Sequence, residues 1–281
     1  MKPAPFHYVR PHSVAEAVQL LAAHGPGAKL LAGGQSLMPL MVRRLQRPEL
    51  VIDITRIAGL DRIEVLPTQL RMGALVSQEQ AQRSAVVRAQ GGGVAQALAW
   101  VANPVVRQRG TVIGNLVANG PGAELPAVAL ALGAEFILQY ADREELVPAA
   151  DLLGAQRSVP RGAMITHVLW PRRRARIGFY EVARRAGHAP VVSSLVMLGD
   201  AECRVSLSGV CRTGLSCPSM ARVIAQQSPR LPSAGELAAA LQEDLTGPVW
   251  EDPYTSARYR LEVAPVVSQR AVQLTLPAEA A

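Results

Sequence analysis

The sequence predicts an α+β protein made of packed subdomains, and three observations lead to this prediction. Residues 6–32 read as a strand, a helix and a second strand, so the chain opens with a small strand–helix–strand unit. From residue 177 onward, short strands follow one another at the spacing of an antiparallel meander, and helices come after them. No internal repeat or low-complexity linker separates the two patterns, so we expect the parts to pack against one another.

The composition favours a compact globular protein. Of the 281 residues, 49% are hydrophobic and 18% charged, which is enough apolar material for a large buried core. The net charge is +7, but the basic residues are scattered apart from residues 172–174, and only 4% of residues are aromatic. A surface that binds nucleic acid is therefore not expected. The sequence has no apolar signal core at its start and no apolar run of membrane-spanning length, so we expect a cytoplasmic protein without a membrane span.

The three cysteines lack the spacing of a metal or cluster site. Cys203, Cys211 and Cys217 form no C-x-x-C pair, so neither an iron–sulfur motif nor a zinc pattern is present. An iron–sulfur cluster would have to come from another chain. The thiols are expected to be reduced, and no metal site is predicted.

The first secondary-structure elements are predicted from caps and apolar runs. Ser13-x-x-Glu16 is a capping box that opens a helix to about residue 23, and Gly25 stops it. Short apolar runs bounded by turn residues predict strands at 6–9, 29–32, 50–53, 63–65 and 70–72.

The glycine pair in residues 30–41, LLAGGQSLMPLM, predicts a corner between a strand and a helix. Gly33 and Gly34 lack Cβ atoms, so the backbone there can adopt positive φ and approach a ligand closely. The helix start that follows, with Gln35 and Ser36, would present N–H groups that attract phosphate oxygens. A plain connection without a ligand is the alternative, because the chain has neither a G-x-G-x-x-G nor a G-x-x-x-x-G-K-[ST] motif.

A second loop of the same kind is predicted in residues 105–119, VVRQRGTVIGNLVAN. Basic, glycine and small polar residues interrupt an apolar run there, and we expect a loop embedded in a strand. The Ser77-x-x-Gln80 box opens a helix before it, and a further helix at 94–101 is expected to end at Asn103-Pro104.

Glu124 lies near the start of the next predicted helix, for which Pro121 fits the first position and Gly133 the stop. A carboxylate there gains from the helix dipole and could accept hydrogen bonds from ribose hydroxyls. A solvated acid at a helix start is the alternative. The two loops could hold one diphosphate from two sides with the polar side chains of Gln35, Ser36, Thr111 and Asn115.

The rest of the chain predicts more strands than helices. Strands are expected at 135–140, 164–170, 177–183, 191–198 and 204–210. The Ser233-x-x-Glu236 box opens a helix to about residue 243, and residues 256–271 are amphipathic enough for a terminal helix.

Three motifs carry a resemblance to a known family. They are LAGGQSLMPL at 31–40, RQRGTVIGN at 107–115, and AELPA at 123–127 with LALGA at 130–134. With FHYVRP at 6–11, FYEVARR at 179–185 and Tyr259-Arg260, the sequence resembles the FAD-binding medium subunit of the molybdenum hydroxylases. Aerobic carbon monoxide dehydrogenase and xanthine dehydrogenase typify that family.

The resemblance implies a set of FAD-binding residues and a fold. By motif, Ala32, Gly33, Gly34, Gln35 and Ser36 would bind one side of the FAD diphosphate, and Thr111, Val112, Ile113, Gly114 and Asn115 the other. Glu124 would bind the adenosine side, while Ile165 and Tyr180 would lie near the cofactor or its flavin. The implied fold is a two-part FAD-binding domain of the vanillyl-alcohol-oxidase (PCMH) type, at 1–55 and 56–175. A C-terminal antiparallel sheet with helices, at 176–281, would resemble the carbon monoxide dehydrogenase flavoprotein C-terminal domain.

The sequence departs from the usual family pattern at three places. Ile113 stands where the family usually has a second glycine, and Asn119-Gly120-Pro121 stands where Ala-Asp-Pro is usual. His188-Ala189 stands where an aspartate and an aromatic residue are usual. We expect these differences to affect FAD affinity more than the fold.

The implied function is that of an FAD-carrying electron-transfer subunit of a molybdenum-containing hydroxylase. A molybdopterin-binding large subunit and a [2Fe-2S] small subunit would be its partners, in a dimer of heterotrimers, and electrons would reach an external acceptor. Residues 180–194 are expected to form an apolar docking flank, and no catalytic residue is expected in this chain. Two alternatives stay open: a free-standing FAD oxidoreductase of the same fold, and a structural subunit that has lost FAD.

Overall fold

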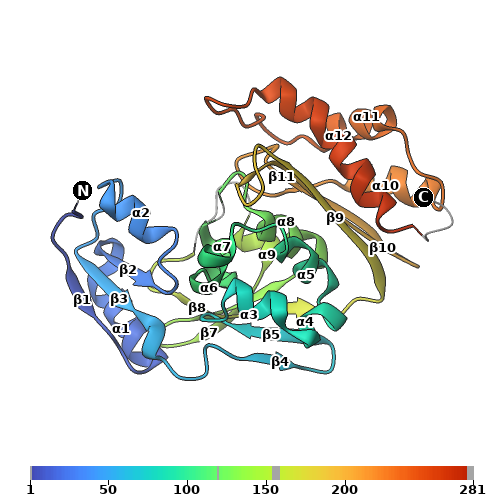
Figure 1. The fold of residues 1–281 in the computed structure, drawn as a ribbon. Coiled ribbons are helices and arrows are strands. Elements are labelled where there is room, and N and C mark those ends of the chain that lie inside the picture. Colours follow the sequence, from blue (N-terminus) through green and yellow to red (C-terminus); the bar gives the residue numbers. More distant parts are fainter. Residues whose placement is uncertain (1, 119, 154–158, 277–281) are drawn as a thin grey trace.

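The computed structural model describes residues 2–118, 120–153 and 159–276 (Figure 1). Asn119, the last residue of the second predicted loop, lies outside them. Three sheets, each built from a different part of the chain, follow one another in the sequence. None of the helices in the described ranges combines the length and the apolar character that a membrane span requires.

The first sheet is parallel and has the order β1-β3-β2, with β1 at His7–Val9, β2 at Ala28–Leu31 and β3 at Leu50–Asp53. The helix α1 (Val14–His24) connects β1 to β2, as predicted. Ser13 Oγ accepts a hydrogen bond from Glu16 N at 3.1 Å, whereas the Glu16 carboxylate reaches back to His12 N at 2.9 Å. A short 3-10 turn (Gly25–Gly27) follows α1, another (Ile54–Arg56) follows β3, and α2 spans Leu37–Val42.

The second sheet is antiparallel, with the order β4-β5-β8-β6-β7. Its strands are β4 (Ile63–Val65), β5 (Gln69–Gly73), β6 (Glu135–Gln139), β7 (Glu144–Pro148) and β8 (Met164–Pro171). Helices α3 to α8 lie on one side of this sheet (Figure 1). These helices and α9 are α3 (Gln78–Arg83), α4 (Ala85–Gln90), α5 (Gly92–Leu98), α6 (Pro104–Arg109), α7 (Val112–Ala118), α8 (Glu124–Leu132) and α9 (Ala149–Leu152).

The structure corrects the prediction for the second glycine loop. The loop is not embedded in a strand but joins two short helices, α6 and α7, and only an isolated bridge between Thr111 and Ser77 has strand character. Asn103-Pro104 begins α6 rather than only ending the previous helix, because Asn103 Oδ1 accepts a hydrogen bond from Val106 N at 3.1 Å. Helix α8 begins at Glu124, three residues after the predicted start at Pro121.

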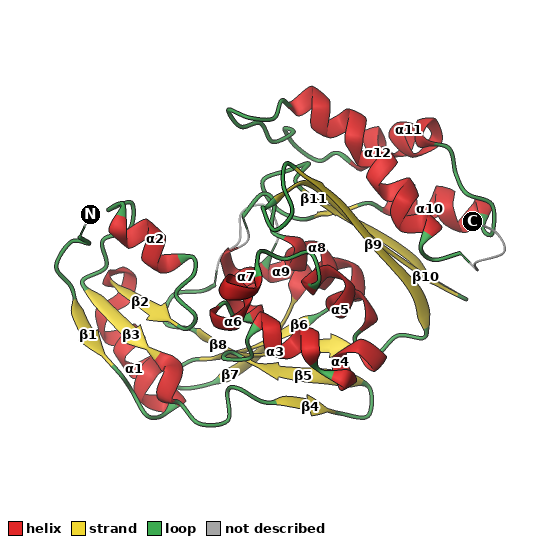
Figure 2. Cartoon of the chain, viewed as in Figure 1, coloured by secondary structure: helices red, strands yellow, loops and turns green. Residues whose placement is uncertain are grey.

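The third sheet is the predicted antiparallel meander, with the order β12-β11-β10-β9. Its strands are β9 (Ala175–Ala183), β10 (Pro190–Gly199), β11 (Cys203–Ser208) and β12 (Leu215–Ser216). Helices α10 (Pro218–Gln227), α11 (Ala234–Asp244) and α12 (Ala257–Gln273) cover one face (Figure 2). Helix α11 starts with the complete capping box predicted from Ser233 and Glu236.

Two apolar cores correspond to this layering. One lies under the first two sheets and extends to Phe179 and Leu195 on the inner face of the third sheet. The other lies between the outer face of the third sheet and α10 to α12. Helix α8 packs on the inner face, where Ser206 Oγ donates a hydrogen bond to Ala127 O and Ser208 Oγ donates one to Ala123 O, each at 2.6 Å.

Candidate functional site

A cavity of about 790 Å³ lies where the first sheet meets helices α6 to α8. Both glycine loops line it, together with the start of α8, residues 159–163 and the loop that follows β9. Most of the predicted FAD-binding residues line it: Ala32, Gly33, Gly34, Gln35, Ser36, Thr111, Ile113, Gly114, Asn115, Glu124 and Ile165. The tertiary structure thus brings together residues that are up to 133 positions apart, from Ala32 to Ile165.

The two glycine loops contact each other directly. A Cβ added to Gly33 would lie 2.0 Å from the carbonyl oxygen of Arg109 and 3.0 Å from Gly110 Cα, far inside van der Waals contact. Gly34 has a φ of +74°, a conformation that side-chain-bearing residues rarely adopt. Gly33 is therefore required for the approach of the second loop, and Gly34 for the turn itself.

The second loop is held by its own threonine. Thr111 Oγ1 accepts a hydrogen bond from Gly114 N at 2.9 Å, and a Cβ on Gly114 would lie 2.7 Å from that oxygen. Val112 is fully buried in the core and does not line the cavity. Ile113 lines it and is only 5% exposed, so the residue that replaces the usual family glycine contributes an apolar surface.

Two buried amide side chains at the cavity each have a carbonyl oxygen that accepts no hydrogen bond from the described residues. Within the described chain, Asn115 Oδ1 and Gln78 Oε1 make no hydrogen bond although both atoms are buried. Gln78 Nε2 donates to Thr111 O at 3.3 Å, so this side chain braces the second loop from α3. Gln78 is not among the residues predicted for the site, because its only local signal is its place inside the Ser77 capping box. A buried acceptor without a partner is costly, and a bound ligand with donor groups would satisfy it.

Glu124 is buried, which overturns the alternative of a solvated helix-start acid. Its exposure is 4%, and it lines the cavity as the first residue of α8. Burial raises the pKa of Glu124 to about 7, while hydrogen bonds from its own backbone N–H and from Asn115 act in the opposite direction. The carboxyl group is therefore close to half-ionised near neutral pH.

Tyr180 does not line the cavity. It lies on β9 and packs against the outer core and, edge-to-face, against Trp100, with ring centroids 5.7 Å apart. Successive side chains of a strand point to opposite faces, so its neighbours Phe179 and Glu181 point to the inner face instead. In the loop after β9, Gly187 and Ala189 line the cavity, whereas His188 is exposed and does not.

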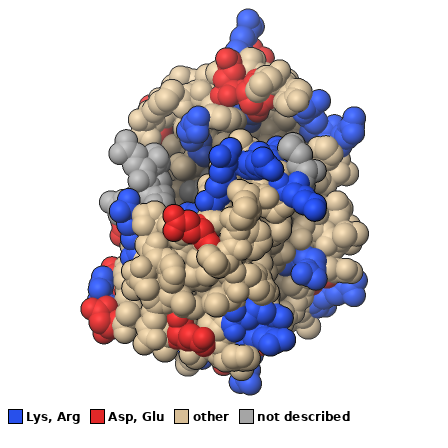
Figure 3. Space-filling view, turned by 90° about the vertical axis from the view of Figure 1, so that its left-hand side faces the viewer, with Lys and Arg blue, Asp and Glu red and all other residues tan. Residues whose placement is uncertain are grey.

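Positive charge is available at the cavity. Lys29 and Arg161 line it, and both residues are exposed. On the face that the first sheet presents, Lys and Arg side chains gather across the middle (Figure 3). Such a surface attracts anionic ligands and raises their rate of association.

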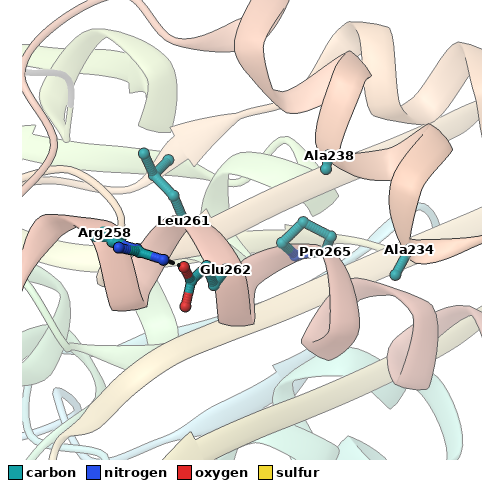
Figure 4. Close-up of a pocket in the computed structure, with 6 residues that line it drawn as sticks. All are labelled: Ala234, Ala238, Arg258, Leu261, Glu262 and Pro265. Carbon is teal, nitrogen blue, oxygen red and sulfur yellow. Dashed lines mark hydrogen bonds and ion pairs between the residues drawn. The ribbon is translucent and has the colours of Figure 1, made fainter.

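A second depression, of about 490 Å³, lies between α11 and α12 (Figure 4). It is lined by Ala234, Ala238, Arg258, Leu261, Glu262 and Pro265. Its two charged groups already pair with each other, since Arg258 Nε lies 2.7 Å from Glu262 Oε1. Its other lining side chains are apolar, and neither glycine loop reaches it, so this depression is not our candidate site.

The large cavity fits the FAD that the resemblance implies. Its volume is near the upper end of the roughly 300–1,000 Å³ range of ligand pockets, as a long dinucleotide requires. Lys29 and Arg161 offer cations for a diphosphate, and Asn115, Gln78 and Glu124 offer acceptors for hydroxyl or amino groups. Glycine and alanine form much of the remaining lining, which lets a planar ring system approach the backbone.

Comparisons with known proteins show the family of the chain. Residues 4–173 match the family described as the FAD binding domain in molybdopterin dehydrogenase. The chain is 33% identical to the 6-hydroxypseudooxynicotine dehydrogenase complex subunit alpha of Paenarthrobacter nicotinovorans, with 98% of this chain and 96% of that protein covered. It is 31% identical to the carbon monoxide dehydrogenase medium chain of Afipia carboxidovorans, with 97% of each chain covered.

The architecture matches as well as the sequence. Carbon monoxide dehydrogenase from Hydrogenophaga pseudoflava superposes with a TM-score of 0.91 at 29% identity, covering 98% of both chains. The PCMH-type FAD-binding fold and its C-terminal antiparallel sheet with helices, both expected from the resemblance, are thereby confirmed. The chain belongs to the family of FAD-binding medium subunits of the molybdopterin dehydrogenases, oxidoreductase complexes of the carbon monoxide dehydrogenase type.

Proposed function

We propose that the cavity between the two glycine loops binds FAD and that the chain uses it to pass electrons within a molybdenum hydroxylase complex. The observation that carries the proposal is the direct contact of the two loops over a cavity with cationic and acceptor groups. The flavin supplies the redox chemistry when bound, and the protein supplies binding, orientation and electrostatics. The proposed binding residues are those that line the cavity, namely Ala32, Gly33, Gly34, Gln35, Ser36, Thr111, Ile113, Gly114, Asn115, Glu124 and Ile165, with Lys29, Gln78 and Arg161 added.

Each part of the cavity has a proposed role. Ser36 stands at the N-cap position of α2, and no cap hydrogen bond engages its side chain within the described residues, so its hydroxyl can donate to a phosphate. Lys29 and Arg161 would balance the diphosphate charge. Glu124 would accept hydrogen bonds from ribose hydroxyls, and Ile165 would contact the ring system. Val112 would contribute only through its backbone, and Tyr180 only through its contact with Trp100.

The proposed partners are a molybdopterin-binding large subunit and a [2Fe-2S] small subunit, in a dimer of heterotrimers. Support comes from two relatives, one named as a subunit of a dehydrogenase complex and the other as a medium chain. Electrons would come from the iron–sulfur clusters of the small subunit and leave to an external acceptor. We also propose a cytoplasmic location and the division into domains 1–55, 56–175 and 176–281. Each of these ranges holds one of the three sheets, except that β9 of the third sheet begins at Ala175.

Only part of the docking flank predicted at 180–194 is exposed in the structure. Residues 190–194 are buried in β10, whereas residues 184–186 are exposed. Exposed aromatic residues lie next to this segment. Trp100, 40% exposed, packs edge-to-face against Tyr180, and Tyr254, 75% exposed, lies under the Arg184 guanidinium at 4.5 Å. Trp, Tyr and Arg are the residue types that dominate protein interfaces. We propose that Trp100, Arg184 and Tyr254 contact the small subunit.

Co-purification from the native host, with a tag on this chain, tests the proposal. Molybdenum, iron and flavin recovered together, with a flavin absorption band, are the expected result. A single 30 kDa species that turns over a reducing substrate alone would instead indicate a free-standing oxidoreductase. A complex that contains molybdenum and iron but no flavin would indicate a structural subunit that has lost FAD.

A further inference from the structure

A second buried carboxyl lies close to Glu124 but outside the cavity lining. Glu181, on β9, is only 4% exposed, and its Oε2 makes no hydrogen bond within the described residues. The two carboxyls are near enough that the charge of Glu124 raises the pKa of Glu181. Glu181 lies in the FYEVARR motif at 179–185 but outside the two glycine loops and the cavity lining, and no role for it follows from the cavity alone.

The register of the third sheet places Glu181 on the face that packs against the start of α8. Ser193 on β10 lies directly opposite Glu181 on β9 and, on its other side, directly opposite Ser208 on β11. Directly opposite side chains share one face of a sheet, so the three residues form a row on the same face. Ser208 Oγ donates a hydrogen bond to Ala123 O at 2.6 Å, so this row faces the start of α8, where Glu124 lies. Ser193 is fully buried, and within the described chain its hydroxyl has no partner either.

No lysine or arginine among the described residues neutralises this pair. Within the described part of the chain, neither Glu124 nor Glu181 forms an ion pair with a lysine or arginine. Burial raises the pKa of Glu181 to about 8, and that of Glu124 to about 7. Two buried carboxylates without a counter-charge cannot both ionise without a large penalty, so near neutral pH the pair carries about one proton.

The polar groups that the structure describes beside this pair are uncharged. Strands β10 and β11 place Ser193 and Ser208 in the row of Glu181, and Asn115 of α7 hydrogen-bonds Glu124. Gln96 of α5 hydrogen-bonds the β9 backbone at Ile177 and Phe179. Arg260 approaches from α12 on the other face, where it hydrogen-bonds Val191 O, Gly209 O and Asp252. The charged or titratable groups of the loop after β9, Arg184, Arg185 and His188, are exposed.

We propose that Glu181 is a positioning residue for the nucleotide. As a neutral carboxylic acid behind Glu124, it lets Glu124 hold the single negative charge of the pair and accept hydrogen bonds from ribose hydroxyls. The inference rests on the proposed FAD site. When both carboxyls are protonated, Glu124 is a weaker acceptor. When both are ionised, their repulsion and desolvation disfavour the bound arrangement.

A bell-shaped pH dependence of FAD affinity follows. Affinity is highest between about pH 7 and pH 8, the values given by the two pKa shifts. Outside this window it falls by up to about tenfold per pH unit, on the acid side because Glu124 gains a proton and on the alkaline side because Glu181 loses one.

The experiment is a titration of the flavin-free full-length chain with FAD from pH 6 to pH 9.5, followed by flavin fluorescence. Wild type, Glu181→Gln, Glu124→Gln and the exposed control Glu243→Gln on α11 are compared. Glu181→Gln keeps a Kd near the wild-type value at pH 7.5, loses the alkaline limb, and keeps the acid limb, because Glu181 is already uncharged over that pH range. Glu243→Gln follows wild type throughout.

The outcomes separate the two proposals. A wild-type Kd that is constant from pH 6 to pH 9.5 overturns the role of Glu181 and leaves FAD binding standing, even if Glu181→Gln fails to fold. A wild-type bell profile that Glu181→Gln retains unchanged also overturns it. No FAD binding at any pH, in a chain that is folded by circular dichroism, overturns the proposed function and this inference with it.

Discussion

The backbone of Gly33 lies against the carbonyl oxygen of Arg109 so closely that a Cβ on Gly33 would be 2.0 Å from that oxygen. The first glycine of the first loop therefore positions the second loop rather than only a ligand. Because the second loop also packs on Gln78 through Thr111, the two loops and α3 form one rigid wall of the cavity. The consequences for mutation follow from this contact.

Gly33→Ala should loosen the cavity wall. The new Cβ meets backbone atoms, which cannot move aside as a flexible side chain can, so the loops must separate. Overpacking of this kind costs about 1–3 kcal/mol of unfolding free energy, and we expect FAD affinity to fall at least about tenfold. Urea unfolding and FAD titration measure the two effects. Gly247→Ala, where nothing lies within 4 Å, is the matched control, and a Gly33→Ala protein indistinguishable from that control would contradict the contact.

Gly34→Val should abolish flavin retention while the fold largely persists. The φ of +74° is strained for any residue with a side chain, at a cost of about 1–3 kcal/mol. The nearest atoms to the new Cβ are side-chain atoms of Leu31 and Met38 at 3.3 Å, which can give way, so the damage stays local. The flavin content of the purified protein is the measurement. Normal FAD content in a folded Gly34→Val protein would show that this turn is not needed for binding.

Glu124→Gln distinguishes a binding role from a structural one. If the carboxylate accepts hydrogen bonds from ribose, its replacement weakens FAD binding by about 1.5–3 kcal/mol at pH 7.5, the scale of a charge-assisted hydrogen bond. If Glu124 only complements the helix dipole, the change appears as at most about 1 kcal/mol of stability. FAD titration of both proteins decides, and an unchanged Kd would falsify the binding role.

The flavin should be bound without a covalent link. Among the described residues that line the cavity there is no histidine, cysteine or tyrosine, the side chains that could bond to the ring system. Acid or heat denaturation should therefore release free flavin into the supernatant, where absorbance measures it. Yellow colour that stays with the precipitated polypeptide would contradict this expectation.

The buried Glu181 should make stability fall as pH rises. Its pKa is about 8 in the folded chain against 4.5 when exposed, so between these values the folded state holds a proton that the unfolded state has lost. Unfolding free energy then decreases with pH by up to about 1.4 kcal/mol per unit for this group. The unfolding free energy of Glu181→Gln, measured relative to wild type, should therefore be at least about 1 kcal/mol higher at pH 8 than at pH 5. Urea unfolding at both pH values measures it, and an equal difference at pH 5 and pH 8 would argue against a protonated Glu181.

The sequence by itself determined the local structure and the family. The serine caps at Ser13, Ser77 and Ser233 were predicted and are present, because a cap depends on groups three residues apart. The glycine turn at Gly34 was predicted for the same reason, since its φ is a local property. The motifs around the two loops were sufficient to identify the FAD-binding family, which the comparisons confirm.

Only the tertiary structure decided which groups share the cavity and how they are charged. Residues 104–118 read as an interrupted strand, yet they form α6 and α7, because Asn103 and Thr111 cap these helices and their apolar side chains pack into the first core. The buried state of Glu124, the support from Gln78 and the pairing with Glu181 could not be predicted either. Burial and desolvation depend on contacts between residues that are far apart in the sequence, and a local sequence pattern does not specify those contacts.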